Sequence, residues 1–496
     1  MGSLRVLSTA VAWQPWTGAV FARARDQRKP ILLAIAASWC ASCHEMDRTC
    51  YADPTIATLI NERFVPIRID ADERPDIADR YTLGGWPTTA FLTPDGQVLT
   101  GGTFVSLERM PSILAQVADA FEALDANGVR QETRAGADTE VPQTPGASVV
   151  DDAALSARVF DTFDARHGGF GAEPKFPLTA PLELALDLCT AGNDATAATI
   201  LVATLDGMGW SPLYDDIDGG FFRYATTRDW QLPHFEKLLE VNAALTSIYL
   251  RTGAALKISR FTDRGSDTLR YIQTWLADPV DGGWRGSQHA AADYYESGSV
   301  ESRQARPAPA VSPALYADSN AAMVQTALHA ARVFGDDGLR DFAIRSLERV
   351  LTTCYKPGSG VAHYFDGQPR VRGLLADQLG MAAACLDTFD VTGNIVYEMM
   401  AEELAHYAIR VLWDDAEGGF FDRARDEAIG LLEVPLKPFA GNCQAARTLR
   451  RLAEASGERE FATFADRTLA AMRPPAAEQG PLAAHYLLAV RDAAGR

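Results

Sequence analysis

The 496-residue sequence has no excess of basic residues, no long apolar run and no dense set of cysteines. Its 46 lysines and arginines are outnumbered by 65 acidic residues, which gives a formal net charge of -19. This charge excludes nucleic acid and anionic membranes as expected partners, because both require a basic face. No stretch approaches the roughly 20 apolar residues that cross a bilayer, and residues 1–7 do not form a signal peptide. We therefore expect a cytoplasmic protein without membrane contact.

Phosphate-cradling glycine loops and dinucleotide fingerprints are also missing, so we expect no cofactor. The seven cysteines are odd in number and mostly scattered, which does not suit a disulfide framework. Only Cys40 and Cys43 form a pair, and a zinc site would need a second pair. Three interpretations of this pair stay open: redox exchange, which we favour, an inactive docking surface, and half of a metal site. We predict no metal.

The cysteine pair lies in Trp39-Cys40-Ala41-Ser42-Cys43-His44, just after the apolar run 31–37. That run is typical of a buried strand, and helical periodicity follows from 41 to 60. Cys40 would thus sit at a strand-to-helix junction, where helix amides and the helix dipole favour a thiolate. We predict Cys40 as the exposed nucleophile and Cys43, one turn later and more buried, as the resolving thiol.

A second motif, Gly85-Trp86-Pro87, precedes a predicted strand at 88–92. A proline at this position is a candidate for a cis bond beside the cysteines. We expect Trp39, Trp86 and Pro87 to form the surface that holds a substrate backbone. Further elements are predicted as a helix at 19–27, a strand at 65–69 and a helix at 106–124.

The motif Trp39-Cys40-x-x-Cys43, Asp70 after the strand 65–69, and Gly85-Trp86-Pro87 together resemble a thioredoxin-like domain. More narrowly, they resemble the spermatogenesis-associated thioredoxin-like proteins, in which such a domain is fused to a glycosidase-like helical toroid. Ala41-Ser42 replaces the histidines common around the cysteines of those relatives, and Ala34 replaces a buried Asp of thioredoxins. The resemblance implies an α/β thioredoxin-like N-terminal domain over residues 1–124, with a protein or small-molecule thiol or disulfide as its partner.

Residues 125–149 are polar and punctuated, as in a linker. From 150 to 496 the strand pattern vanishes and about twelve helical segments follow. Gly-Gly-aromatic connections recur about every 60 residues, which indicates repeated helical hairpins. We predict an all-α (α/α)6 toroid at 150–496, with an open solenoid as the alternative. The connections lie at 168–170, 219–221, 282–284 and 418–420, with a degenerate copy at 358–360, and Gly192, Gly253, Gly335, Gly393 and Gly457 are predicted helix C-caps.

The Gly-Gly loops and the N-termini of the inner helices should share one end of the toroid, which makes that end a natural ligand mouth. Residues 281–311 are expected to form a mobile loop over it. The stretches 168–177 and 214–237 also resemble the spermatogenesis-associated family. A histidine beside carboxylates could act there as an acid or base, as in the toroidal sugar epimerases and glycosidases. The predicted binding residues are Lys175, His234, Glu236, Asp318, Asn320 and Asp377; their ordinary alternative is helix capping.

Three functions compete on these grounds. The first is a thiol-disulfide oxidoreductase that uses Cys40 and Cys43. The second is a carbohydrate-active toroid, epimerase or hydrolase, with a sugar ligand and His234 as acid or base. The third is a non-catalytic binding or scaffold protein.

Overall fold

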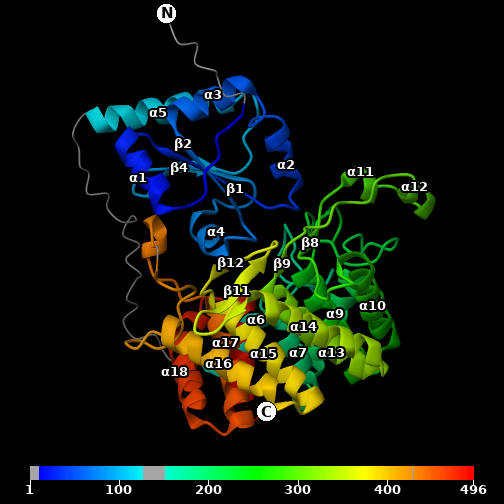
Figure 1. Cartoon of the computed structure of the whole chain (residues 1–496). Coiled ribbons are helices and arrows are strands. Elements are labelled where there is room, and N and C mark those ends of the chain that lie inside the picture. The colour runs from blue at the N-terminus through cyan, green and yellow to red at the C-terminus, as the bar shows by residue number, and fades with distance from the viewer. Residues whose placement is uncertain (1–9, 127–150, 427, 496) are drawn as a thin grey trace, which may run out of the picture. The chain divides into compact units, whose positions relative to one another are not determined.

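The computed structural model describes residues 10–126, 151–426 and 428–495 (Figure 1). The chain divides into two compact units: an N-terminal unit, Met1–Ser148 with Arg425–Pro435, and a helical unit, Val149–Ala424 with Leu436–Arg496. The predicted linker lies outside the described residues, except for positions 125 and 126. In the described part of the chain, no helix combines the length and the apolar character needed to cross a bilayer.

The N-terminal unit contains a four-stranded sheet in the order β2-β1-β3-β4. β1 pairs in parallel with β2 and antiparallel with β3, and β4 extends the sheet antiparallel to β3. Its strands are β1 (Ile31–Ala36), β2 (Val65–Asp70), β3 (Thr88–Leu92) and β4 (Val98–Gly102); its helices are α1 (Gly18–Gln27), α2 (Ala41–Arg48), α3 (Pro54–Arg63), α4 (Pro75–Tyr81) and α5 (Met110–Ala126). The predicted strands and the thioredoxin-like class are confirmed.

The central strand β1 is buried along its whole length, as expected for an apolar run covered on both faces. Leu32 and Ala34 share one core cluster with residues of α3 and α5, including Ile60 and Leu114. β1 therefore fixes the position of the residues that follow it.

The helical periodicity from 41 to 60 belongs to two helices rather than one. α2 ends at Arg48, and α3 begins at Pro54. Asp53 caps α3 by accepting the backbone N–H groups of Thr55 and Ile56, and proline fits the first turn because its missing N–H has no helical partner there.

The helical unit is a closed ring. In the described residues, six inner helices alternate in sequence with six outer helices, and each inner helix packs against the next, from α7 round to α19 and back. This confirms the (α/α)6 toroid and excludes the open solenoid. The inner helices are α7 (Ala180–Gly192), α9 (Leu239–Leu256), α13 (Ala317–Phe334), α15 (Leu375–Thr392), α17 (Phe439–Ser456) and α19 (Ala484–Ala493); the outer helices are α6 (Asp152–Phe160), α8 (Ala195–Gly209), α10 (Ser259–Tyr271), α14 (Asp337–Cys354), α16 (Ile395–Leu412) and α18 (Arg459–Ala476).

Long connections lead from each outer helix to the next inner helix, and they carry the remaining short elements. Where the Gly-Gly pattern degenerates, the chain forms strands instead, and β11 pairs with β9, β10 and β12. These elements are β5 (Tyr224–Ala225), β6 (Pro233–His234), β7 (Lys237–Leu238), β8 (Ser287–Gln288), β9 (Leu315–Tyr316), β10 (Tyr355–Lys356), β11 (Gly360–Phe365) and β12 (Pro369–Arg372), with the short helices α11 (Ala292–Tyr295), α12 (Val300–Gln304), η1 (Ile272–Leu276) and η3 (Gly480–Ala483); η2 (Gly430–Glu433) belongs to the N-terminal unit.

Each Gly-Gly loop starts with an aspartate four residues before its first glycine. In the loop at Asp164, the backbone N–H of Asp164 donates to the carbonyl of Gly169, and the N–H of Gly168 donates back to Asp164. Both glycines have positive φ, the conformation that glycine adopts without strain. The loops at Asp215, Asp278 and Asp414 repeat both backbone bonds.

In the loops at Asp215, Asp278 and Asp414, an amide side chain in the first turn of the inner helix holds the loop. Asn320 accepts the N–H of Trp284 and donates to the carbonyls of Trp284 and Tyr316. Asn242 and Asn442 make the equivalent bonds, and Gln378 does the same for β11. The loop ends of the toroid are therefore positioned by buried polar anchors.

The connection around 281–311 is anchored, contrary to the prediction of a mobile loop. Arg303 is buried and forms ion pairs at 2.7 Å with Asp215 and with Asp218. The hydroxyl of Tyr295 donates to Gln288 at 3.0 Å. Burying the guanidinium between two carboxylates holds this segment against the Gly-Gly loop that carries them.

Candidate functional site

Cys40 caps the N-terminus of α2, directly after β1 and its short turn. Its Sγ accepts the backbone N–H of Cys43 at 3.1 Å, and the two sulfurs form a disulfide. Because first-turn amides and the helix dipole place positive charge here, the same position stabilises a thiolate after reduction. The predicted strand-to-helix junction is confirmed.

The prediction that Cys40 is exposed is wrong. Cys40 is 4% exposed and Cys43 is 2% exposed. The physical reason is that the disulfide and the amide hydrogen bond turn the Cys40 sulfur onto the first turn of α2. An attacking thiol therefore needs a local opening to reach it.

Trp86 and Pro87 lie at the same edge of the sheet as the cysteines. Ile35 in β1 lies opposite Thr88 in β3, so the residues before β3 meet the end of β1. The Trp86–Pro87 bond is cis, as predicted. Trp39 packs edge-on against Trp86 at 5.6 Å between ring centroids. Its buried indole donates to Asp72, so its part in holding a substrate stays a prediction.

Asp70 supplies a carboxyl group at this edge. It ends β2 and lies opposite Ala36 in the parallel pair with β1. Burial raises the pKa of Asp70 to about 6, although the backbone N–H groups of Asp72, Glu73 and Ser38 donate to it. Ser38 is two residues before Cys40, so a group that titrates near neutrality lies beside the cysteine loop.

Lys175 and Asn320 are structural, which corrects their prediction as ligand-binding residues. The Lys175 side chain is fully buried, with Nζ 2.7 Å from Asp164 and 2.8 Å from the carbonyl of Arg228. Asn320 is fully buried, and its side-chain amide forms hydrogen bonds with the backbone of Trp284. Both side chains stabilise Gly-Gly loops rather than face a ligand.

His234 and Glu236 are neighbours, but they do not start an inner helix as predicted. His234 lies in β6, five residues before α9 begins. Its half-exposed ring stacks on Tyr224 at 4.2 Å, and its Nδ1 is 3.9 Å from Oε2 of the buried Glu236. The two do not form a hydrogen-bonded acid-base pair in this structure.

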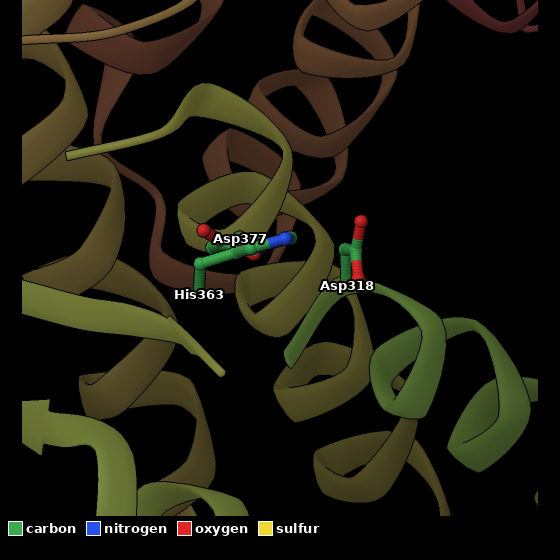
Figure 2. A group of neighbouring side chains, drawn as sticks. All are labelled: Asp318, His363 and Asp377. Atoms are coloured by element: carbon green, nitrogen blue, oxygen red, sulfur yellow. The ribbon is translucent and has the colours of Figure 1, made fainter. Parts of the chain in front are cut away.

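Asp318 and Asp377 come together with a histidine that sequence reasoning missed. His363 in β11 reaches toward the first turns of α13 and α15, and its Nδ1 lies 2.9 Å from Oδ1 of Asp377. One donor atom from each of the three residues lies within 4.8 Å of the others. Figure 2 shows the imidazole extending across Asp377 toward the carboxylate of Asp318.

The carboxylates of this cluster carry more negative charge than the histidine balances. Burial raises the pKa of Asp377, although His363 acts in the opposite direction. The pKa of Glu240, in the first turn of α9, is raised by desolvation of its carboxylate and then by the negative charge of Asp318. The first turns of α13 and α15 thus hold two acidic groups near one imidazole, and Glu240 adds a third negative charge that interacts with Asp318.

A polar cavity of about 440 Å³ lies among the inner helices. Arg447 pairs with Asp492, Arg451 pairs with Asp387 at 2.6 Å, and burial lowers the pKa of His329 to about 4. Of the predicted toroid residues, Asp318 lines this cavity. The other five inner helices also line it, with residues that include Glu183, Ser247, Gly380, Gln444 and Asp492.

The fold and the site define a class before any comparison: a thioredoxin-like unit with a CxxC pair, joined to an (α/α)6 toroid. Residues 4–137 match a family model named Thioredox_DsbH and described as "Protein of unknown function, DUF255". A part of the chain that covers 18% of its length is 35% identical over 98 residues to thiol:disulfide interchange protein DsbD 1 of Pseudomonas aeruginosa, of which it covers 16%. The N-terminal unit is therefore similar to a thioredoxin-type family of unknown function.

The chain is similar to the spermatogenesis-associated proteins, which confirms the resemblance. Human spermatogenesis-associated protein 20 is 23% identical over 553 residues, covering 85% of this chain and 70% of that protein. An uncharacterized Caenorhabditis elegans protein, B0495.5, is 28% identical over 291 residues, covering 54% of this chain. The alignment spans 39% of the length of that worm protein.

Solved structures share the toroid fold. Cellobiose 2-epimerase of Bacillus thermoamylovorans superposes with a TM-score of 0.52 at 11% identity, over 63% of this chain and 82% of the epimerase. A D-mannose isomerase gives the same TM-score at 15% identity, over 64% of this chain and 84% of the isomerase. At these identities the likeness shows the fold alone.

Proposed function

We propose that the chain is a thiol-disulfide oxidoreductase with Cys40 and Cys43 as its redox pair. The observation that carries the proposal is the disulfide across the first turn of α2, with the Cys40 sulfur accepting the Cys43 amide. The match to a thioredoxin-type family model and the similarity to a thiol:disulfide interchange protein support the same chemistry.

The reduced pair would act in two exchange steps. The Cys40 thiolate attacks one sulfur of a substrate disulfide, a mixed disulfide forms, and the first substrate thiolate leaves. The Cys43 thiolate then attacks the Cys40 sulfur, releases the second substrate thiolate and closes the Cys40–Cys43 disulfide. Two electrons pass to the substrate, and an external dithiol restores the reduced pair.

Asp70 is the proposed proton acceptor for the cysteine loop. Ala34, at the position of the buried Asp of thioredoxins, is a core residue and can take no proton. Asp70 lies at the sheet edge beside Ser38, with a pKa of about 6. Near neutral pH such a group can accept a thiol proton and return it to a leaving thiolate.

The proposal is tested by dithiothreitol-driven reduction of insulin disulfides. Cys40→Ser should abolish turnover because no mixed disulfide can form. Cys43→Ser should stop turnover after one step and leave a trapped mixed disulfide that mass spectrometry detects. Cys50→Ser is the control, because Cys50 is buried in the core with its sulfur near the carbonyl of Val105. Wild-type activity no greater than that of the Cys40→Ser variant would refute the proposal.

A carbohydrate-active toroid is the second candidate function. The polar cavity of about 440 Å³ favours it, since small-molecule sites are commonly 300 to 1,000 Å³. The half-exposed His234 remains the proposed acid or base, although it is not among the residues that line this cavity. Deuterium uptake from solvent into a panel of free sugars tests the epimerase form. Uptake by the wild type that His234→Ala abolishes would support it, and absence of uptake would refute it.

A further inference from the structure

We propose that Asp318, His363 and Asp377 form a binding site for one divalent transition-metal ion. The three donors come from separate elements, α13, β11 and α15, and meet at the loop end of the toroid (Figure 2). The inference concerns the helical unit and is independent of chemistry at the cysteines.

The donor types suit such an ion. Two carboxylates and one imidazole form a mixed oxygen and nitrogen set of the kind that Mn²⁺, Fe²⁺ or Zn²⁺ accepts. One donor atom from each residue lies within 4.8 Å of the others. Donors on one ion with bonds of about 2.1 Å lie at most about 4.2 Å apart, so only a small closure is needed. Asp318 is half-buried and lines the cavity, so its side chain has room to make that movement.

A second observation points to a ligand at this place. Asp377 is fully buried, and within the described residues its Oδ2 has no donor at hydrogen-bond distance and angle, although the backbone N–H of Asp318 also faces this carboxyl group. A buried carboxylate oxygen without a donor is costly, and native structures rarely contain one without an ion or ordered water. The other oxygen, Oδ1, bonds to His363, so Oδ2 is the atom of Asp377 that is left to bind an ion.

The local charge also favours a cation. Asp318 and Asp377 lie in helix first turns, and Glu240 occupies the corresponding turn of the preceding inner helix. One imidazole cannot neutralise three carboxylates, whereas a divalent ion with its histidine ligand neutral balances two of them. The cavity that Asp318 lines provides a route of entry. Glu240 would then act as a nearby carboxylate that supports the ion or its water.

The test is a Mn²⁺ titration of the full-length chain after chelator treatment, followed by electron paramagnetic resonance. It is done in the Cys40→Ser, Cys43→Ser background, so that the cysteine pair cannot supply ligands. We expect one bound Mn²⁺ per chain, displaced by Zn²⁺. Asp377→Asn and His363→Ala should each weaken binding at least about tenfold. Asp152→Asn, the same change in the exposed first turn of α6, should leave the affinity unchanged within about twofold.

Two outcomes would overturn the inference: no stoichiometric binding at millimolar Mn²⁺ or Zn²⁺, or equal affinity in the wild type and Asp377→Asn. If circular dichroism shows that Asp377→Asn does not fold, Asp318→Asn replaces it, because Asp318 is half-buried and its loss leaves the His363–Asp377 pair in place. Failure here leaves the cysteine proposal untouched, since none of these measurements depends on thiol exchange.

Discussion

The carboxyl group of Asp70 lies at the buried sheet edge beside the cysteine loop, where its ionised form is unfavourable. Burial raises its pKa from 3.8 to about 6. The folded chain therefore holds a proton that the unfolded chain has already lost between about pH 4 and pH 6. Stability contributed by this group is present at low pH and falls as the pH rises through that window. Above about pH 6, the ionised carboxylate destabilises the fold by about 3 kcal/mol.

Asp70→Asn should remove this penalty, because a neutral amide keeps a carbonyl oxygen for the same N–H donors. We expect the variant to be more stable than the wild type by about 2 to 3 kcal/mol at pH 7.5 and equal to it near pH 4. Urea unfolding of the N-terminal unit at the two pH values measures the difference. Asp26→Asn, an exposed position in α1, is the matched control. A variant that is less stable at pH 7.5 would show that Asp70 is ionised and well solvated.

Single residues were predicted unevenly from sequence. The cysteine pair and Trp86-Pro87 were placed correctly, because a short motif between a strand and a helix fixes their surroundings. Lys175 and Asn320 were misread, because a polar residue that anchors a loop and one that binds a ligand look alike until the partners are known. His363 was missed because it lies where the Gly-Gly repeat degenerates; that break in the repeat was its only signal.

The Gly-Gly loops show at the level of elements why the toroid needs glycine. Gly168 has φ of +69°, and a Cβ there would lie 2.4 Å from the carbonyl oxygen of Ala203. Gly335, the C-cap of α13, has φ of +65°, but a Cβ there would meet no atom within 4 Å. Both glycines have positive φ, but only Gly168 is closely packed. Comparing substitutions at the two positions therefore separates the effect of backbone conformation from that of packing.

Gly168→Ala should destabilise the helical unit by about 3 kcal/mol or more, because rigid backbone must move. Gly335→Ala should cost only about 1 kcal/mol, the strain of a left-handed alanine. Thermal unfolding followed by circular dichroism compares the two. Equal losses in both variants would mean that the loop yields easily and does not fix the toroid end.

Helices and strands followed from sequence more reliably than their boundaries. Repeating glycines predicted the closed ring, and Gly335, Gly393 and Gly457 are left-handed caps as expected. Gly192 ends α7, one residue before the cap Asn193, and Gly253 lies inside α9. A Cβ at Gly253 would come within 2.7 Å of the backbone nitrogen of Thr262, so that glycine serves helix packing. The regular spacing of glycines in the sequence does not tell a helix cap from a glycine that allows close helix packing.

At the scale of the whole molecule, the N-terminal unit includes a segment from late in the sequence. Arg425–Pro435 belongs to this unit, although the residues on either side of it belong to the helical unit. The Tyr81 hydroxyl accepts the N–H of Leu431 at 2.8 Å and donates to Gly96 at 2.7 Å. Arg80 donates to the carbonyls of Leu431 and Val434. No periodicity or motif in residues 425–435 indicated this, because the contacts depend on tertiary structure.

Tyr81→Phe should release this segment. One buried and one part-buried hydrogen bond are lost, with an expected cost of about 1 to 3 kcal/mol to the N-terminal unit. Hydrogen exchange of the Leu431 amide should accelerate in the full-length variant. Tyr51→Phe is the control, since its hydroxyl bonds to Thr89 within residues 1–148. Unchanged exchange at Leu431 in Tyr81→Phe would show that the segment is held by other contacts.

Reversible thiol-disulfide exchange at Cys40 and Cys43 is the central claim, and one redox titration tests it. The full-length protein is equilibrated in glutathione buffers of graded potential, alkylated without denaturation and analysed by mass spectrometry. The five other cysteines are unpaired, so their labelling should not depend on the potential. The Cys40–Cys43 disulfide gains thiols on reduction, and we predict that these two thiols take up label together in a single two-electron transition. A pair that never gains label across the range, or gains it without reversal on reoxidation, would contradict the account.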